Sequence, residues 1–224
     1  MTELFFIRHG KTYGNTLGRY IGTTDEPLCE EGRTALAENA EKRLAGIRPD
    51  AVYASPMKRC LQTAEILFPG VPVRVFQELR ECDFGEFENR NYQELSGNAA
   101  YQAWIDSGGA LPFPGGESRE GVQERCVEGF RQVLEDVRQR CEGRTGEPGA
   151  AEGAGTEECF RAALVVHGGT IMSILSACAF PQEEYYHWQV KNGEGFRALW
   201  DETDKGGIRL YEISHIGADS GVSA

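Results

Sequence analysis

The stretch that decides the fold is LFFIRHG, residues 4–10. Its four consecutive apolar residues predict a β-strand buried on both faces, because a strand with one wet face would alternate apolar and polar side chains. The abrupt change to arginine, histidine and glycine marks the end of the strand and the start of a loop. The N-terminus therefore predicts a strand at the centre of an α/β fold, with two basic side chains where it ends.

Later segments repeat this pattern of an apolar run that stops at polar or glycine residues. They are residues 50–55 and 162–169, with a weaker strand at 71–76 and two β-like segments at 196–200 and 208–213. Helical patterns lie at residues 32–44, 56–68, 117–141 and 170–179, and Ser55 is the expected cap of the second helix. Alternating strands and helices predict a three-layer α/β/α fold with a mostly parallel central sheet.

Two regions interrupt the alternation. Residues 85–121 are rich in aromatic and turn-forming residues, and we expect them to form an inserted cap region over one end of the sheet and the active site. Residues 143–158 contain mostly glycine, alanine and charged side chains, which predicts a flexible surface loop. With these two exceptions, residues 1–224 are expected to form a single domain.

Composition excludes several classes of protein. The 23 lysine and arginine residues against 35 aspartate and glutamate residues give a net charge of −12, which argues against a nucleic-acid groove or an anionic-membrane surface. No apolar run approaches the roughly 18–20 residues that span a bilayer, and Met1 is not followed by a basic signal region. The 7 cysteines are scattered without a CxxC pair, as in proteins with reduced thiols. We therefore expect a cytoplasmic protein without nucleic-acid or membrane partners.

Basic side chains follow three of the expected strands. Arg8 and His9 end the first, Arg59 lies one helical turn after the second, and His167 ends a later one. Because the carboxyl ends of parallel strands meet at one edge of a sheet, these four side chains are expected to converge. The helix near Thr170 would point its N-terminal N–H groups at the same place. Such a pocket suits a compact dianion, meaning a phosphoryl group.

Other roles for these residues remain open. A single histidine at a strand end is more often structural than catalytic, but two of them beside glycines and arginines favour a site. Metal binding is the main chemical rival; Arg8 and Arg59 would repel a divalent cation, and no carboxylate lies at ligand spacing beside either histidine. We therefore expect no metal and no cofactor. His187 and His215 are interpreted as surface or packing residues, and the cysteines as small hydrophobic residues.

Several motifs together resemble a known family. In chain order they are residues 4–15, 22–28 with Gly32, 55–64, 79–85, 114–118 and 165–169. Their sequences and their order resemble the histidine phosphatase superfamily, in its phosphoglycerate mutase-like branch, and the resemblance covers about residues 3–215. Within that branch, residues 20–25 and the compact length are most similar to alpha-ribazole phosphatases.

The resemblance implies a role for individual residues. His9 would be the nucleophile, Arg8, Arg59 and His167 would bind the phosphoryl oxygens, and Glu81 would donate a proton to the leaving group. Candidate phosphate contacts are Asn15, Thr23 and the Gly168 N–H. Lys11 and residues 85–89 depart from the usual family pattern, which puts the substrate in doubt but not the reaction. By its sequence context alone, Glu81 would be read as a surface carboxylate.

These observations predict a metal-independent phosphomonoesterase that acts through a phosphohistidine on a small phosphorylated metabolite. The nearby arginines would also disfavour protonation of His9 and keep it available for attack. The family resemblance points to alpha-ribazole 5′-phosphate, a metabolite of the cobalamin pathway. The alternatives are a phosphoglycerate mutase and a catalytically silent phospho-ligand binding module; an intact His9, Glu81 and His167 disfavour the silent module. Residues 85–116 carry one cation, Arg90, and several aromatic rings that either form a small core or line the mouth of the pocket.

Overall fold

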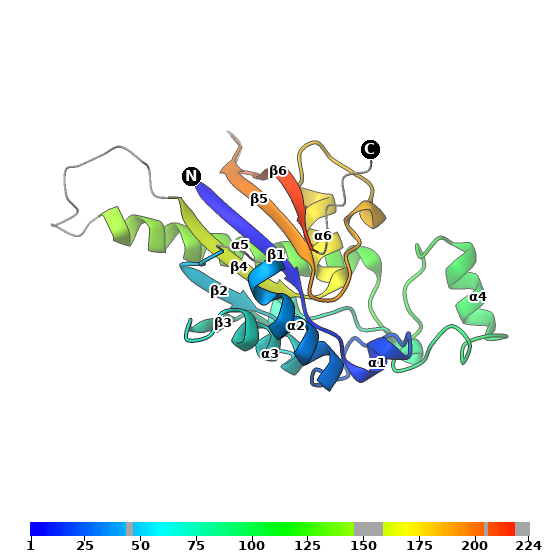
Figure 1. The fold of residues 1–224 in the computed structure, drawn as a ribbon. Helices are drawn as coiled ribbons and strands as arrows, with labels where there is room; N and C mark the ends of the chain where they lie inside the picture. Colours follow the sequence, from blue (N-terminus) through cyan, green and yellow to red (C-terminus); the bar gives the residue numbers. More distant parts are fainter. Residues whose placement is uncertain (44–46, 146–158, 204–205, 218–224) are drawn as a thin grey trace, which may run out of the picture.

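Six strands form one sheet in the computed structural model, which describes residues 1–43, 47–145, 159–203 and 206–217 (Figure 1). The strands are β1 (Thr2–Arg8), β2 (Ala51–Ala54), β3 (Val73–Val75), β4 (Phe160–Val166), β5 (Gly195–Glu202) and β6 (Ile208–Ile216). Their order is β3-β2-β4-β1-β5-β6. The first four strands in this order run parallel to one another, and β5 and β6 are added antiparallel at one edge.

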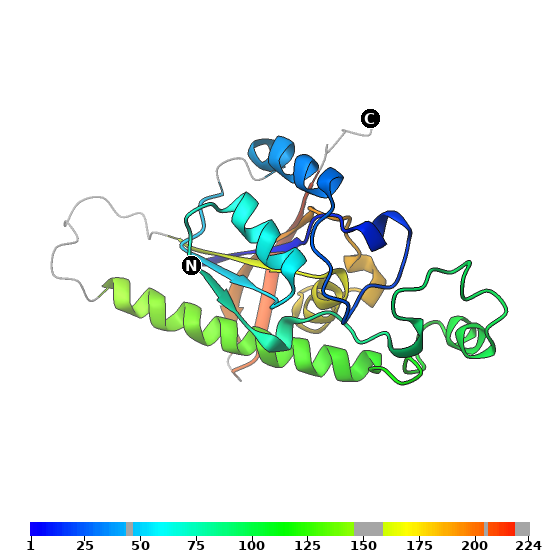
Figure 2. The same cartoon turned by 90° about the horizontal axis from the view of Figure 1, so that it is seen from below.

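Helices cover both faces of the sheet. The α-helices are α1 (Tyr13–Thr16), α2 (Glu30–Arg43), α3 (Lys58–Leu67), α4 (Ala99–Asp106), α5 (Arg119–Thr145) and α6 (Gly168–Cys178). In Figure 2, α2 and α3 lie on one side of the strands, and the long α5 lies on the other side with α6. This arrangement confirms the predicted α/β class and the mostly parallel central sheet. None of the described helices is long and apolar enough to cross a membrane.

The starts of two helices differ from the sequence prediction. The helix α3 begins at Lys58, so Pro56 precedes it, and its N-cap is Met57 rather than Ser55. The Ser55 hydroxyl instead lies 2.7 Å from the His167 ring. The helix α6 begins at Gly168, with His167 itself as the N-cap residue. Strands β2 and β4 therefore pass into α3 and α6 within one to three residues, which keeps Ser55 and His167 at the edge of the sheet.

The strand β1 separates two hydrophobic cores. Leu4 and Phe6 face the core beneath α5 and α6, where the Phe6 ring lies 5.4 Å from the Phe130 ring. Phe5 and Ile7 face the other core, which α3 covers. All four side chains are almost completely buried. The unbroken apolar run of the sequence is therefore the consequence of a strand with a core on each side.

Residues 85–121, which we call the cap segment, lie beyond the carboxyl ends of the strands (Figures 1 and 2). They contain the 3₁₀ helix η2 (Gly85–Phe87) and α4. Phe87 is fully buried in the segment, where it contacts the rings of Tyr101, Trp104 and Phe113. Part of the aromatic content therefore forms a small core. Most of the loop expected at 143–158 lies outside the described residues.

One glycine draws the two ends of the cap segment together. Gly85 has φ +52, and a Cβ atom there would lie 2.2 Å from the Pro114 carbonyl oxygen. The next amide, that of Glu86, donates a hydrogen bond of 2.8 Å to this same oxygen. A side chain at position 85 would break this contact, so the cap segment needs glycine at its first residue.

Truncation of the central strand tests the two-core architecture. We expect Phe6→Ala to lower the free energy of unfolding by about 3–5 kcal/mol, because it leaves a cavity against Phe130 in a fully buried position. Urea denaturation followed by circular dichroism measures this change. The control is Ile105→Ala in α4, where the side chain is 46% exposed and the expected change is within about 0.5 kcal/mol. Similar losses in both variants would contradict the assignment of the core.

Candidate active site

The ends of three parallel strands bring the predicted basic residues together. Arg8 is paired with Val166 in the register of β1 and β4, so His9 and His167 follow these strands at the same level. The His9 N–H donates to the Val166 carbonyl over 3.0 Å, and the two imidazole rings lie 5.2 Å apart. The predicted convergence at the carboxyl edge of the sheet is therefore present in the structure.

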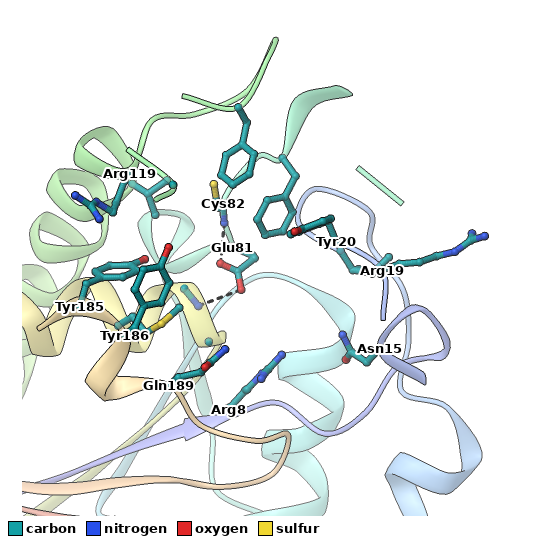
Figure 3. A pocket seen from close by; sticks show the side chains of 18 of the residues that line it. Arg8, Asn15, Arg19, Tyr20, Glu81, Cys82, Arg119, Tyr185, Tyr186 and Gln189 are labelled. Carbon is teal, nitrogen blue, oxygen red and sulfur yellow. Dashed lines mark hydrogen bonds between the residues drawn. The ribbon is translucent and has the colours of Figure 1, made fainter. Parts of the chain in front are cut away.

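A cavity of about 280 Å³ opens beside these strand ends (Figure 3). Five of the predicted site residues line it: Arg8, His9, Asn15, Glu81 and Gly168. The others do not. Arg59 and His167 are fully buried beside His9, and Thr23 is exposed outside the lining. The roles of these three residues as phosphate contacts stay predictions.

One ring nitrogen of His9 is engaged by the backbone and the other is left without a proton. Its Nδ1 lies 2.7 Å from the Gly10 carbonyl oxygen, to which a protonated Nδ1 donates, so Nε2 keeps its lone pair. Burial lowers the pKa of His9 well below its ordinary value, and the charges of Arg59 and Arg8 lower it further. The imidazole is therefore neutral, as the flanking arginines predicted from the sequence.

Arg8 carries an unused donor at the cavity. Its Nη1 donates to the Val190 carbonyl over 2.7 Å, while Nε is buried without a hydrogen-bond partner. The guanidinium group lies against Gly168, where a Cβ atom would come within 3.4 Å of Cζ. Burial lowers the pKa of Arg8, the negative charge of Glu81 opposes this shift, and the positive charge of Arg59 adds to it.

Arg59 is held by backbone carbonyls rather than by a carboxylate. It donates to the Thr24 and Gly22 carbonyl oxygens over 2.8 and 2.9 Å. Its Nε also donates to His167 Nδ1 over 3.3 Å. His167 Nε2 therefore carries the proton and donates to the Ser55 hydroxyl. Among the described residues, neither Arg8 nor Arg59 forms an ion pair, although the negative charge of Glu81 in the same cavity acts on Arg8. A fully buried and a partly buried cation therefore share one site with a single carboxylate in its described lining.

Glu81 reaches the cavity from the opposite wall (Figure 3). One carboxylate oxygen accepts from the Cys82 N–H over 2.9 Å. The other accepts from the Gly169 N–H over 3.3 Å, at the second residue of α6. The helix therefore points its positive end at Glu81, and this residue is the one carboxylate in the described lining of the cavity.

The C-terminal half of the chain supplies residues around the cavity that no sequence motif predicted. Asn192 donates through Nδ2 to the His9 carbonyl over 3.1 Å and to Asn15 Oδ1 over 3.2 Å. Tyr185 and Tyr186, from the 3₁₀ helix η3 (Tyr185–Trp188), line the cavity together with Gln189. No motif marks these residues, because they belong to a connection that is positioned only by packing.

The cavity wall away from His9 is mostly aromatic. Tyr20, Phe84, Trp104 and Phe113 line it in addition to the two tyrosines of η3. Two arginines, Arg19 and Arg119, also line this wall. Arg90, the one cation that the sequence places between residues 85 and 116, is not in the lining. Arg19 is paired with Glu94 over 2.7 Å, and Arg119 lies over the Tyr185 ring at 5.6 Å. The wall thus offers aromatic surfaces for a flat group, together with two arginines that the sequence analysis had not placed at the cavity.

The chain matches a known protein family and is similar to several of its members. The family described as "Histidine phosphatase superfamily (branch 1)" matches residues 4–210. The adenosylcobalamin/alpha-ribazole phosphatase of Salmonella typhimurium is 30% identical over 214 residues, covering 88% of this chain and 94% of that protein. Phosphoserine phosphatase 1 of Hydrogenobacter thermophilus is 32% identical over 144 residues, covering 62% and 66%. The crystal structure of a putative alpha-ribazole-5′-P phosphatase from Escherichia coli matches with a TM-score of 0.71 at 25% identity, covering 94% of both chains.

The protonation state of His9 has a direct test. We expect its NMR signals to keep the neutral form as the pH falls through about 6.5, the ordinary pKa of histidine. Arg8→Gln removes a positive neighbour and raises the pKa of His9 towards that value. Since the unfolded chain takes up protons on His9 and His167 below about pH 6.5 and the folded chain does not, their contribution to the free energy of unfolding falls as the pH drops through this range. A wild-type His9 that titrates near 6.5 would contradict this description of the site.

Proposed function

This chain belongs to the histidine phosphatase superfamily and is a phosphatase, and we propose that it hydrolyses phosphate monoesters through a phosphohistidine formed at His9. One observation carries the proposal: the neutral His9 ring stands beside two arginines, Arg59 fully buried and Arg8 partly buried, that have no ion-pair partner among the described residues. Burying a cation without a countercharge is costly, and a phosphoryl dianion supplies that charge when it binds. The substrate therefore completes the electrostatics of the site.

In the first step, His9 Nε2 attacks phosphorus and the bond from phosphorus to the leaving oxygen breaks. Glu81, entering as the carboxylic acid, gives its proton to that oxygen, so the leaving group departs as an alcohol. Arg8 binds the phosphoryl oxygens from the cavity wall, and Arg59 contributes its charge from beside His9. His167, Asn15, Thr23 and the Gly168 N–H complete the proposed set of phosphate contacts.

In the second step, water attacks the phosphohistidine. The Glu81 carboxylate takes a proton from the water while the bond from phosphorus to Nε2 breaks, which releases phosphate and returns His9 to its neutral form. After the second step, Glu81 again carries its proton and His9 Nε2 again holds its lone pair, so the enzyme is back in its starting state. The proposed steps use side chains of this protein alone and need no metal.

For the leaving group, we propose a nucleoside-like alcohol that carries a flat heterocycle, as in alpha-ribazole 5′-phosphate. The support is the aromatic wall, which has rings of the cap segment (Trp104, Phe113) and rings of η3 (Tyr185, Tyr186) around one cavity. Stacked or edge-to-face rings bind a planar group better than they bind a sugar. Two relatives of this chain carry alpha-ribazole phosphatase in their names.

A covalent phosphoenzyme is the first expected result. Brief exposure to a radiolabelled phosphate ester should leave an acid-labile, base-stable label on the wild-type protein. His9→Ala should carry no label and show no turnover, because it lacks the nucleophilic Nε2. His187→Ala, at an exposed histidine outside the cavity lining, is the matched control and should label as the wild type does. Label on serine or cysteine, or full activity of His9→Ala, would disprove the assignment.

Substrate preference is tested with a panel of phosphate esters in the presence of EDTA. We expect net phosphate release, no conversion of 3- to 2-phosphoglycerate, and a higher kcat/KM for aromatic esters than for sugar phosphates. Trp104→Leu should lower kcat/KM for the aromatic esters by about 2- to 10-fold, the value of one aromatic pair. Tyr92→Leu changes an exposed ring of the same segment outside the cavity and should leave kcat/KM unchanged. Efficient phosphoglycerate isomerisation would instead support a mutase.

A further inference from the structure

The backbone that carries Glu81 is held from outside the cavity by an ion pair between Arg125 and Glu117. We propose that these two residues are positioning residues, which fix the Glu81 carboxyl group for proton transfer to the leaving oxygen. Neither of them lines the cavity, so neither touches the substrate. The inference rests on the proposed function, because it assumes that Glu81 is the acid of the reaction.

Arg125, on α5, binds three carbonyl oxygens around Glu81. Its Nη1 donates to the Glu78 carbonyl over 2.8 Å and to the Arg80 carbonyl over 2.9 Å. Its Nη2 donates to the carbonyl of Glu81 itself over 3.3 Å. A single guanidinium group thus fixes the backbone from the 3₁₀ helix η1 (Gln77–Leu79) to the proposed acid.

Glu117 holds the other side of the same loop. Its carboxylate accepts from Arg125 through Nε over 2.8 Å and through Nη2 over 2.7 Å, the paired geometry of an arginine–carboxylate contact. The same carboxylate accepts from the Asp83 N–H over 2.9 Å, and the Glu117 N–H donates to the Asp83 carbonyl over 3.0 Å. Glu81 therefore lies between two anchored points of the backbone, at residues 80 and 83.

The Arg125–Glu117 pair is less exposed to solvent than a surface salt bridge. The Arg125 side chain is 13% exposed and that of Glu117 is 22% exposed. Burial alone would raise the pKa of Glu117, but the hydrogen bonds from Arg125 and Asp83 and the charges of Arg125 and Arg80 lower it below its ordinary value. The pair is charged at neutral pH, and water has little access to either partner.

Close packing of α5 supports the same loop. Gly129 lies one turn after Arg125, and a Cβ atom there would be 2.5 Å from Glu78 Cβ. The helix therefore approaches η1 more closely than any other residue at this position would allow. This contact sets the distance from which Arg125 reaches the three carbonyls.

The chemistry requires such restraint. Residues 80–84 form no helix or strand, so the segment has no regular hydrogen bonds of its own to position Glu81. A misplacement of about 1 Å at a reacting group can cost about 100-fold in rate. From its anchored backbone, the Glu81 side chain reaches the Gly169 N–H at the start of α6, and the two carboxylate contacts seen in Figure 3 complete its orientation.

The experiment compares two esters of similar shape that differ in leaving group. Phenyl phosphate releases phenol, with a pKa of about 10 as in tyrosine, and depends strongly on an acid. p-Nitrophenyl phosphate releases a much weaker base. The variants are Arg125→Lys and Glu117→Gln, each alone and combined with Glu81→Gln, and thermal melting confirms that each is folded. Arg197→Gln, which breaks a partly buried pair with Glu3 at the opposite end of β1, is the matched control.

We expect each single variant to lower kcat for phenyl phosphate by about 10-fold or more, with a smaller loss for p-nitrophenyl phosphate and KM changed by less than about 2-fold. Added to Glu81→Gln, either change should cost nothing further, since the group that it positions is already absent. Arg197→Gln should affect both esters equally, if at all. Glu117→Gln keeps its side-chain shape and leaves Arg125 its carbonyl acceptors, so it remains decisive if Arg125→Lys unfolds.

Two results would overturn the inference alone: equal losses for the two esters in the single variants, or the full loss of rate repeated in the Glu81→Gln background. Either result would assign the pair a general structural role. If Glu81→Gln itself costs both esters the same factor, the acid role of Glu81 is wrong and both proposals fall together. The two failures are therefore distinguished by the Glu81→Gln variant measured by itself.

Discussion

The protein holds two arginine guanidinium groups beside a neutral histidine, Arg59 fully buried and Arg8 partly buried, and within the described residues neither of them forms an ion pair. Arg59 is held by loop carbonyls and by His167, and Arg8 keeps one buried donor without a partner. Partial charges on carbonyl oxygens stabilise a cation less than a full negative charge does. The fold therefore maintains an excess of positive charge beside His9, and the proposed phosphoryl ligand would supply negative charge at this place.

The rest of the structure makes this deficit tolerable. Two cores, one on each side of β1, stabilise the strand whose end carries Arg8 and His9. The connection before β5 folds back across that end, where the Gly193 N–H donates to the carbonyl of Arg8 and Asn192 binds that of His9. Because the end of β1 is held in this way, the sheet keeps the positive charges of Arg8 and Arg59 close together without rearranging. A site that is preorganised in this sense favours a negatively charged ligand.

The proposed reacting groups and the aromatic wall proposed to bind the leaving group come from different kinds of structure. His9, Arg59 and His167 stand at or just beyond strand ends, in positions that the register of the sheet determines. The aromatic wall comes from the cap segment and η3, which are joined to the sheet by loops. Glu81 lies between these two parts of the molecule. Under the proposed function, substitutions in the wall would change the ester that is accepted while the residues at the strand ends stay the same, because the two parts have few residues in common.

The sequence alone determined the parts of this protein that depend on local pattern. The apolar run at residues 4–7 predicted a doubly buried strand, the alternation of elements predicted the sheet, and the family motifs pointed to His9 and Glu81. Local pattern misplaced Ser55, which is a partner of His167 rather than a helix cap. Only the tertiary structure decided which cavity these residues share and what holds them there.

The contacts that the sequence did not predict join residues that are far apart in the chain. Asn192 binds the His9 carbonyl across 183 positions, and Arg125 binds the Glu81 carbonyl across 44. Neither residue stands in a distinctive motif, because an asparagine in a loop and an arginine on a long helix are common in any soluble protein. Hydrophobic periodicity reports which face of an element is buried, but not which backbone oxygen a long side chain will meet. That choice depends on how closely α5 packs against η1, which is a property of the assembled layers.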